Sequence, residues 1–491
     1  MNLFCLMRNI RVALILTVFV KMPVLLHAQE KWGLRKCVEY AMANNVSVRQ
    51  ADIDARTAQL TYQQSKWAQL GQYSLSTGLG LSFGYSVDPA TNLFVAEDFL
   101  SQSYSLQGAV NLFNWFGQRR LIASNKFTYL AQKTNIDKVR NDVALNVAAA
   151  YLTALEAREQ INVSATQVQL SVDQLSNTRK LVDAGSQPEL NAAELEAQLA
   201  SDSATLLGAQ ATFDQDVLQL KATLSLDAAF PFDLDTPPVE TIPVEPIGQL
   251  QPDFVYSLAE KTFPQAQLNE YRIAAADKAY QSSKSQLYPT LQLFGSLGDR
   301  FSNTLQKPGQ PSLSGVDTTD YFVVNNGAIN KVLSPSYTYG YGRNSFSQLW
   351  QGYGSQLSQN FGQQVGIQLN VPLFNGNQAR TNMQKARLNI RTANLQKESD
   401  LLTLKQNVYQ AYSAATAALQ KFQANKKALS TADRSYELAS KRYEVGLLNT
   451  IDYITNQNNL FKAKINLLAS QYDYVFKMKV LEFYKGEGVK L

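Results

Sequence analysis

The sequence predicts a mixed fold, in which long antiparallel helices form a coiled-coil barrel and a few strands contribute to a β-barrel shared between subunits. Three observations lead to this prediction. Apolar residues recur every seven positions in two stretches that lie 261 residues apart. Each stretch follows two segments in which apolar residues alternate with small or polar ones. Both helical patterns are also far longer than the helices of an ordinary globular core.

The seven-residue repeat indicates that one structural plan occurs twice. The first copy consists of Val147, Ala154, Ile161, Val168, Leu175 and Val182. The second copy consists of Val408, Ala415, Phe422, Leu429, Tyr436 and Tyr443. Three positions after each apolar residue runs a second stripe of mostly small residues, which in the first copy are Ala150, Ala157, Ser164, Ser171 and Thr178. Such paired stripes are typical of long helices that pack closely side by side, and we interpret the chain as a tandem duplication.

Residues 1–28 have the pattern of a secretory signal peptide. Arg8 and Arg11 precede an apolar run over residues 12–20, and Ala28 supplies a small residue for cleavage. Removing this segment lowers the formal net charge from +5 to about +2. We therefore expect export from the cytoplasm and no nucleic-acid partner, because nucleic-acid binding depends on many phosphate-neutralising cations.

Histidine and cysteine are nearly absent. The one histidine, His27, and one of the two cysteines, Cys5, lie in the predicted signal peptide. The remaining Cys37 has no second cysteine with which to form an internal disulfide. The rest of the chain cannot supply a His/Cys metal cluster or a Ser-His-Asp triad. We therefore expect a protein that is not an enzyme and that holds no cofactor.

The first structural repeat is predicted to span residues 29–226. It begins with a helix over 34–70 and continues with strands over 73–85 and 103–112, which a loop connects. The apolar face of the first strand carries Tyr73, Leu75, Leu79, Leu81, Phe83 and Tyr85. A helix over 118–184 follows and is expected to end at Gly185, where a left-handed cap is favourable. A returning helix begins near Pro188 and continues to about residue 225.

The second repeat, residues 253–491, follows the same order after a proline-rich linker over 227–252. That linker holds six of the 15 prolines. A helix over 263–287 precedes two strands, and residues 298–361 between these strands predict a large surface loop, with extension of the strands as an alternative. A helix over 378–445 then ends at Gly446, and a returning helix continues to about residue 485.

The strands indicate where the protein resides. A strand that crosses a bilayer needs about 9–11 residues, with lipid-facing apolar side chains alternating with polar ones. The segment over 73–85 fits this pattern, with tyrosine at both ends. The alternative is a soluble sandwich with its apolar faces inward. Four strands with free edges are not viable in hydrocarbon, so the strands would join a barrel closed by other copies of the chain.

Five segments together carry a resemblance to a known family. They are KRYEVGLLNTIDYITNQNNLFKAKINL at 441–467, its weaker first-repeat copy RKLVDAGSQPELNAAELEAQLA, LRKCVEYAMANNVSV near the mature N-terminus, and VNLFNWFGQRR and VPLFNGNQAR after the strand pairs. In their order and duplication they resemble the outer-membrane efflux and secretion channels of the TolC type. The resemblance covers essentially the whole mature chain.

This resemblance implies a homotrimer in the outer membrane of a Gram-negative cell that extends into the periplasm. Each subunit would give four strands to a transmembrane β-barrel in contact with outer-membrane lipid. Its partners would be a periplasmic adaptor (membrane fusion) protein and an inner-membrane transporter of the RND or ABC class. The channel would be a passive exit duct for drugs or other small molecules. The alternatives are an exit duct for type I protein secretion and a periplasmic coiled-coil scaffold without a pore.

The resemblance also implies a periplasmic aperture near Gly446. Asp452, six residues later, matches a constriction-lining Asp of the family. Three copies in a trimer would favour cations at a narrow ring. The alternative is that Asp452 is a solvated charge in the first turn of a helix, where a negative charge is favourable. The turns at Gly185 and Gly446 would be helix caps that face the adaptor.

Other aperture positions differ from a family member with a fuller charge network. Thr455 and Asn191 stand where that relative has Asp, and Leu448 stands where it has Arg. Tyr443 matches the family residue, but it also continues the heptad stripe. For Tyr443 we therefore weigh core packing against a gating hydrogen bond.

Overall fold

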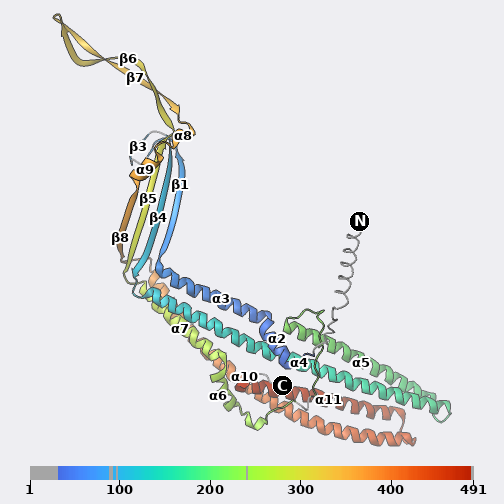
Figure 1. Ribbon diagram of the computed structural model, residues 1–491. Coiled ribbons are helices and arrows are strands. Elements are labelled where there is room, and N and C mark those ends of the chain that lie inside the picture. Colours follow the sequence, from blue (N-terminus) through green and yellow to red (C-terminus); the bar gives the residue numbers. More distant parts are fainter. Residues whose placement is uncertain (1–30, 88–91, 96–97, 239–241, 488–491) are drawn as a thin grey trace, which may run out of the picture. The chain divides into compact units, whose positions relative to one another are not determined.

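The computed structural model describes residues 31–87, 92–95, 98–238 and 242–487 (Figure 1). The predicted signal peptide lies outside these residues. The chain divides into two compact units, each drawn from both halves of the sequence. The helical unit comprises the described residues of Met1–Thr57, Tyr129–Tyr271 and Asn394–Leu491. The sheet unit comprises those of Ala58–Thr128 and Arg272–Ala393.

Two very long helices confirm the prediction from the heptads. Helices α4 (Gly117–Asp183) and α10 (Gln378–Glu444) contain 67 residues each, which corresponds to about 100 Å. The returning helices are α5 (Glu189–Leu224) and α11 (Thr450–Glu482). Among the described residues, no helix combines the length and the apolar composition needed to cross a membrane.

The single helix predicted over residues 34–70 is interrupted at one position. Residues 34–70 form α2 (Leu34–Asn44), α3 (Val46–Trp67) and the short η1 (Ala68–Leu70), with a break at Asn45. The Asn45 side chain stabilises this break through two hydrogen bonds. Its Oδ1 accepts a hydrogen bond from the Ser47 amide at 2.8 Å. Its Nδ2 donates to the Thr223 carbonyl, in the last turn of α5, at 2.8 Å.

The described residues of the proline-rich linker contain little regular secondary structure before a short 3-10 helix. Leu234 forms a parallel bridge with Trp32, and η3 (Ile247–Gln249) leads into α6 (Pro252–Thr262), which the sequence analysis did not predict. Helix α7 (Pro264–Ser285) corresponds to the predicted helix over 263–287.

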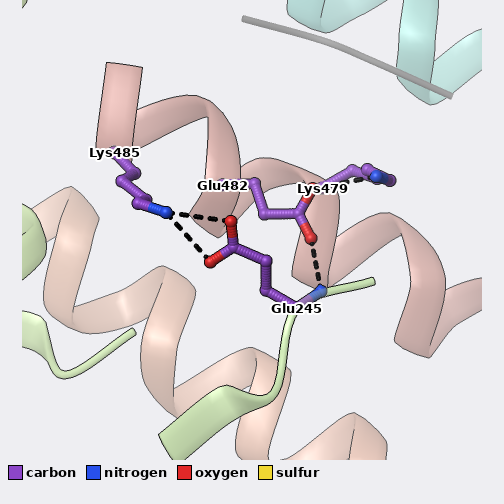
Figure 2. Close-up of polar contacts among 4 residues, drawn as sticks. All are labelled: Glu245, Lys479, Glu482 and Lys485. Carbon is purple, nitrogen blue, oxygen red and sulfur yellow. Dashed lines mark hydrogen bonds and ion pairs between the residues drawn. The ribbon is translucent and has the colours of Figure 1, made fainter. Parts of the chain in front are cut away.

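Charged contacts attach this linker to the C-terminal end of the chain (Figure 2). Glu482 near the end of α11 accepts a hydrogen bond from the Glu245 amide at 2.8 Å and pairs with Lys479 at 2.8 Å. Lys485, in η4 (Phe483–Glu487), reaches both carboxylate oxygens of Glu245 at 2.9 and 3.1 Å. The Lys479 and Glu482 side chains are only 6% and 9% exposed, so this is a buried ion pair that orders the linker.

The core of the helical unit uses the predicted stripes over part of their length. Val147, Ala154, Val408 and Ala415 are fully buried. Tyr151 is also buried, and its hydroxyl donates to the Asp235 carbonyl at 2.7 Å. Around the first stripe, the largest apolar cluster adds residues from α2 and α5, among them Cys37, Ala41, Leu220 and Leu224.

The sheet unit contains a four-stranded antiparallel sheet in the order β1-β4-β5-β8. These strands are Gln72–Ser82, Phe99–Phe113, Thr290–Thr304 and Gly362–Asn370. Between β1 and β4, the short strands β2 (Ser86–Val87) and β3 (Phe94–Val95) pair with each other. Strand β1 ends at Ser82 rather than Tyr85, and β4 begins at Phe99 rather than Ser103, so the connecting segment lies earlier in the chain than predicted but is about as long.

One face of this sheet is apolar and exposed. Directly paired residues in an antiparallel sheet share a face, and the register places Leu75 opposite Leu106, which lies opposite Leu297. The exposed apolar residues of this face are Tyr73, Leu75, Leu79, Leu81, Leu106, Leu297, Val365, Ile367 and Leu369. The opposite face is dominated by small and polar residues such as Ser74, Gln107 and Gln364.

The large loop predicted over 298–361 is mostly regular structure, and the alternative of strand extension holds for its first residues. Strand β5 continues to Thr304, and strands β6 (Gln306–Asn325) and β7 (Ala328–Arg343) form a separate two-stranded sheet (Figure 1). The physical reason is the turn: Asn326 and Gly327 have φ values of 51° and 82°, and two positive φ values characterise a type I′ hairpin.

Two short helices follow the hairpin. Helices α8 (Phe346–Leu349) and α9 (Tyr353–Asn360) complete the segment. Strand β8 ends its pairing with β5 at Gly298, and beyond that point Gln356 of α9 bonds the Ser302 backbone, accepting at 3.0 Å and donating at 2.9 Å. This side chain replaces a missing strand partner along the edge of β5.

Candidate functional site

The helix tips of the helical unit contain the predicted site residues. Gly185 and Gly446 end α4 and α10 with φ values of 71° and 74°. The Gly185 amide donates to Val182 at 2.8 Å and the Ser186 amide to Leu181 at 2.9 Å. The equivalent bonds at Gly446 are 2.9 and 2.8 Å long. Both turns are Schellman caps, so the predicted capping role is confirmed, whereas the adaptor-facing role stays a prediction.

Asp452 lies in the first turn of α11 and is exposed. Asn449 caps this helix: its Oδ1 accepts from the Asp452 amide at 2.7 Å, and its Nδ2 donates to Asp452 Oδ2 at 2.9 Å. The carboxylate therefore takes part in the helix cap, where the helix dipole also favours a negative charge. Its exposure leaves it accessible to ions.

Tyr443 packs on another tyrosine. Its ring stacks on that of Tyr453, with centroids 4.5 Å apart and an interplanar angle of 11°. Its hydroxyl is buried and makes no hydrogen bond within the described residues. In this conformation Tyr443 therefore contributes through the packing of its ring and not through a hydrogen bond from its hydroxyl.

A hydrogen-bonded group of three residues connects the two repeats. The Tyr436 and Tyr453 hydroxyls lie 2.9 Å apart. Gln174 of α4 donates through Nε2 to the Tyr453 hydroxyl at 2.6 Å and to that of Tyr436 at 3.2 Å. Burial raises the pKa of Tyr453 above its ordinary value, and the hydrogen bond with Tyr436 raises it further. The Tyr453 hydroxyl therefore remains neutral near physiological pH.

A second polar group lies between the helices farther from the turns. Asp202 of α5 is only 5% exposed, and Ser171 Oγ donates to its carboxylate at 2.5 Å. Gln167 and Gln198 also donate to it, at 3.3 and 2.8 Å. Gln198 exchanges two hydrogen bonds with Asn458 of α11, each 3.1 Å long.

The interface between the helix pairs is therefore substantially polar near the tips. It also contains a small apolar contact, in which Ile454 packs on Leu175, Ala192 and Leu195. The sequence analysis singled out none of Gln174, Tyr453 or Asp202. The available signal was the pair of glutamines at 167 and 174, which are separated by one heptad and follow the small-residue stripe.

The other predicted residues lie on the same turns. Thr455 donates to the Ile451 carbonyl of its own helix at 2.8 Å, and Leu448 is half-buried. Asn191 donates to Gln187 at 3.4 Å on the α4–α5 turn, and no hydrogen bond between described residues joins it to Asp452. Within the described ranges, no group of three or more His, Cys, Asp or Glu residues could hold a metal ion.

Comparisons with known proteins agree on one family. Residues 38–225 and 333–486 match the sequence profile described as Outer membrane efflux protein. The outer membrane protein TolC of Escherichia coli (strain K12) is 22% identical over 446 residues, which cover 90% of this chain and 80% of TolC. The outer membrane efflux protein BepC of Brucella suis biovar 1 (strain 1330) is 19% identical over 369 residues, covering 74% of this chain and 67% of BepC.

Solved structures show the same fold. The structure of CusC matches with a TM-score of 0.69 at 13% identity, covering 92% of this chain and 91% of that one. The outer membrane protein VceC of Vibrio cholerae matches with a TM-score of 0.68 at 16% identity, covering 93% of this chain and 97% of VceC. These likenesses show that the chain has the fold of TolC-type channels.

Proposed function

Because the chain belongs to the outer membrane efflux protein family, we propose that it forms a homotrimeric channel in the outer membrane that extends into the periplasm. Each subunit gives β1, β4, β5 and β8 to a shared transmembrane barrel. The long helices of the three subunits form a tunnel on the periplasmic side. The family is one of efflux channels, and the chemistry of the channel is passive conduction rather than catalysis.

The observation that carries this proposal is the four-stranded sheet. Strands β1 and β8 lie at its two edges, and each has a partner on one side only within the described chain. Unpaired edges are unfavourable in hydrocarbon, whereas an exposed apolar face is what lipid requires. Closing three such sheets edge to edge satisfies both conditions. In a coiled-coil scaffold without a pore, the apolar face of the sheet would have no lipid to cover it.

The energy for transport comes from partners. We infer that an inner-membrane transporter of the RND or ABC class drives substrates into the tunnel, and that a periplasmic adaptor protein joins the two. The turns at Gly185 and Gly446 are the proposed adaptor contacts. Efflux of small molecules is favoured over type I protein secretion, because efflux is the activity in the family's description.

The helix tips act as the gate in this proposal. Neutral polar contacts such as those of Gln174 and Gln198 exchange readily for contacts with water, so separating the helix pairs exposes little apolar surface. Three copies of Asp452 around the aperture would attract cations.

The charge at Asp452 provides a test of the channel. In planar bilayers the wild-type protein should conduct ions with cation selectivity, and Asp452→Asn should reduce that selectivity and weaken block by multivalent cations added from the periplasmic side. Folding should be preserved, because an exposed first-turn charge contributes only about 0.3–1 kcal/mol. Asp433→Asn, an exposed change elsewhere on α10, is the control. Unchanged selectivity and unchanged block in the Asp452 variant would show that this residue is only a helix-end charge.

A further inference from the structure

The β6–β7 ribbon, Gln306–Arg343, has two chemically different faces. On β7, every second position from Ile329 to Tyr339 is apolar or aromatic except Lys331. The register places Val324 opposite Ile329, Leu313 opposite Tyr337 and Val316 opposite Pro335. The apolar face contains Leu313, Val316, Phe322, Val324, Ile329, Leu333, Tyr337 and Tyr339. Each of these side chains is at least half exposed, from 50% for Tyr337 to 70% for Ile329.

The opposite face is mainly polar and its serine and threonine side chains are satisfied within the ribbon, although Tyr321 and Val323 are exposed there near the turn. Ser312 and Thr338 form a cross-strand hydrogen bond at 3.3 Å, and the Ser314 hydroxyl donates to the Ser336 carbonyl at 3.0 Å. On the apolar face, the ammonium of Lys331 lies 5.7 Å from the centroid of the Phe322 ring. The larger uncovered apolar surface of the ribbon therefore lies on the face that carries Leu313, Leu333 and Tyr337.

The size of the apolar face limits what covers it. Strand β7 has 16 residues, so at about 3.4 Å per residue and two strands in width the face measures roughly 500 Å². That is as large as the largest apolar patch of a typical monomer, and an isolated two-stranded hairpin is only marginally stable in water. It is nevertheless smaller than the roughly 800 Å² per partner that a freely diffusing protein complex buries.

A surface of this size is sufficient when its partners are already tethered nearby, because tethering raises the effective concentration. The root of each ribbon is attached to the sheet: the Leu305 amide donates to Asp98 at 2.7 Å, and Asn344 Nδ2 donates to Thr304 at 2.7 Å. A trimer that closes its barrel with these sheets therefore brings three roots to one mouth.

We propose that the apolar faces of the three β6–β7 ribbons pack against one another and form a single column at the extracellular mouth of the channel. The occupant of each apolar face is a second copy of this chain. This inference rests on the proposed trimer. Layers of like residues, such as the three copies of Leu333, meet at the centre of the column, and the serine and threonine residues of the polar face point outward.

Neighbouring residues on the two faces provide a matched test in the full-length protein on intact cells. Leu333→Cys and Ser334→Cys replace adjacent exposed residues of opposite faces. The one other cysteine among the described residues, Cys37, is buried. A short bifunctional maleimide should cross-link Leu333→Cys into covalent dimers at least tenfold more efficiently than Ser334→Cys. A membrane-impermeant maleimide should label Ser334→Cys freely and Leu333→Cys poorly.

The outcomes separate this inference from the proposed function. If the protein is a trimer but both cysteines label equally, or Leu333→Cys is protected without cross-linking, the column is refuted and the channel stands. Absence of surface labelling at Ser334→Cys would also refute it. A monomeric protein would refute the proposed function itself. Ile329→Cys and Asn330→Cys repeat the comparison near the turn, so that poor folding of one variant does not decide the result.

Discussion

Replacing Glu482 with glutamine is expected to destabilise the helical unit by about 3–5 kcal/mol, because it leaves the Lys479 ammonium buried without a compensating charge. The two side chains are 9% and 6% exposed, so water cannot solvate the ammonium in the folded state. Glutamine retains the shape of the side chain and an acceptor for the Glu245 amide. The expected loss therefore reports the charge pair rather than a cavity.

Glu437→Gln is the matched control. Glu437 also pairs with a lysine on its own helix, Lys441, but both side chains are about two-thirds exposed, 64% and 66%. Exposed pairs contribute little to stability, so this variant should unfold like the wild type. Circular dichroism during denaturant-induced unfolding would measure both changes, and equal effects of the two substitutions would argue against a buried pair at Lys479.

Gln174→Leu should shift the channel toward its open state. The substitution removes the donor to Tyr436 and Tyr453 at similar volume and leaves the two hydroxyls bonded to each other. A hydrogen bond within a protein contributes a net of about 0.5–1.5 kcal/mol, and each 1.4 kcal/mol changes an equilibrium about tenfold. We therefore expect open probability in planar bilayers to rise at least several-fold.

Gln169→Leu is the control for this variant, because Gln169 is an exposed residue of the same helix whose side chain bonds to Asp173 one turn away. It should leave open probability unchanged. If Gln174→Leu opens and closes like the wild type, closure does not depend on this contact between the repeats.

Local signals explain why the helices were predicted well. The heptads fixed the course of α4 and α10, and glycines at 185 and 446 marked where they end, because only a few residue types adopt a left-handed cap. The alternation over 73–85 predicted β1 for an equally local reason. Its side chains point alternately to the two faces of the sheet.

The failures have local causes as well. For residues 298–361 the prediction relied on polar composition, although Asn326-Gly327 between alternating segments is a strong hairpin signal. At Asn45 the break depends partly on the Thr223 carbonyl, which is distant in the sequence. No pattern within the first helix could have revealed that contact.

The candidate site was predictable only in part. The two glycines were found from the ends of the heptad patterns, and Asp452 was found only through its match to a constriction-lining Asp of the resembled family. The contacts of Gln174 with Tyr453 and of Ser171 with Asp202 were not found, because they depend on which heptad positions of separate helices face each other. That arrangement is tertiary, and the sequence showed only that long helices pack closely.

The central claim, that three copies of the chain close one barrel, is tested most directly by the mass of the protein extracted from the outer membrane in detergent. Native mass spectrometry should show an assembly of three chains, because the β1 and β8 edges of each sheet require partners. A stable, folded monomer that conducts ions through a barrel closed on itself would contradict the account.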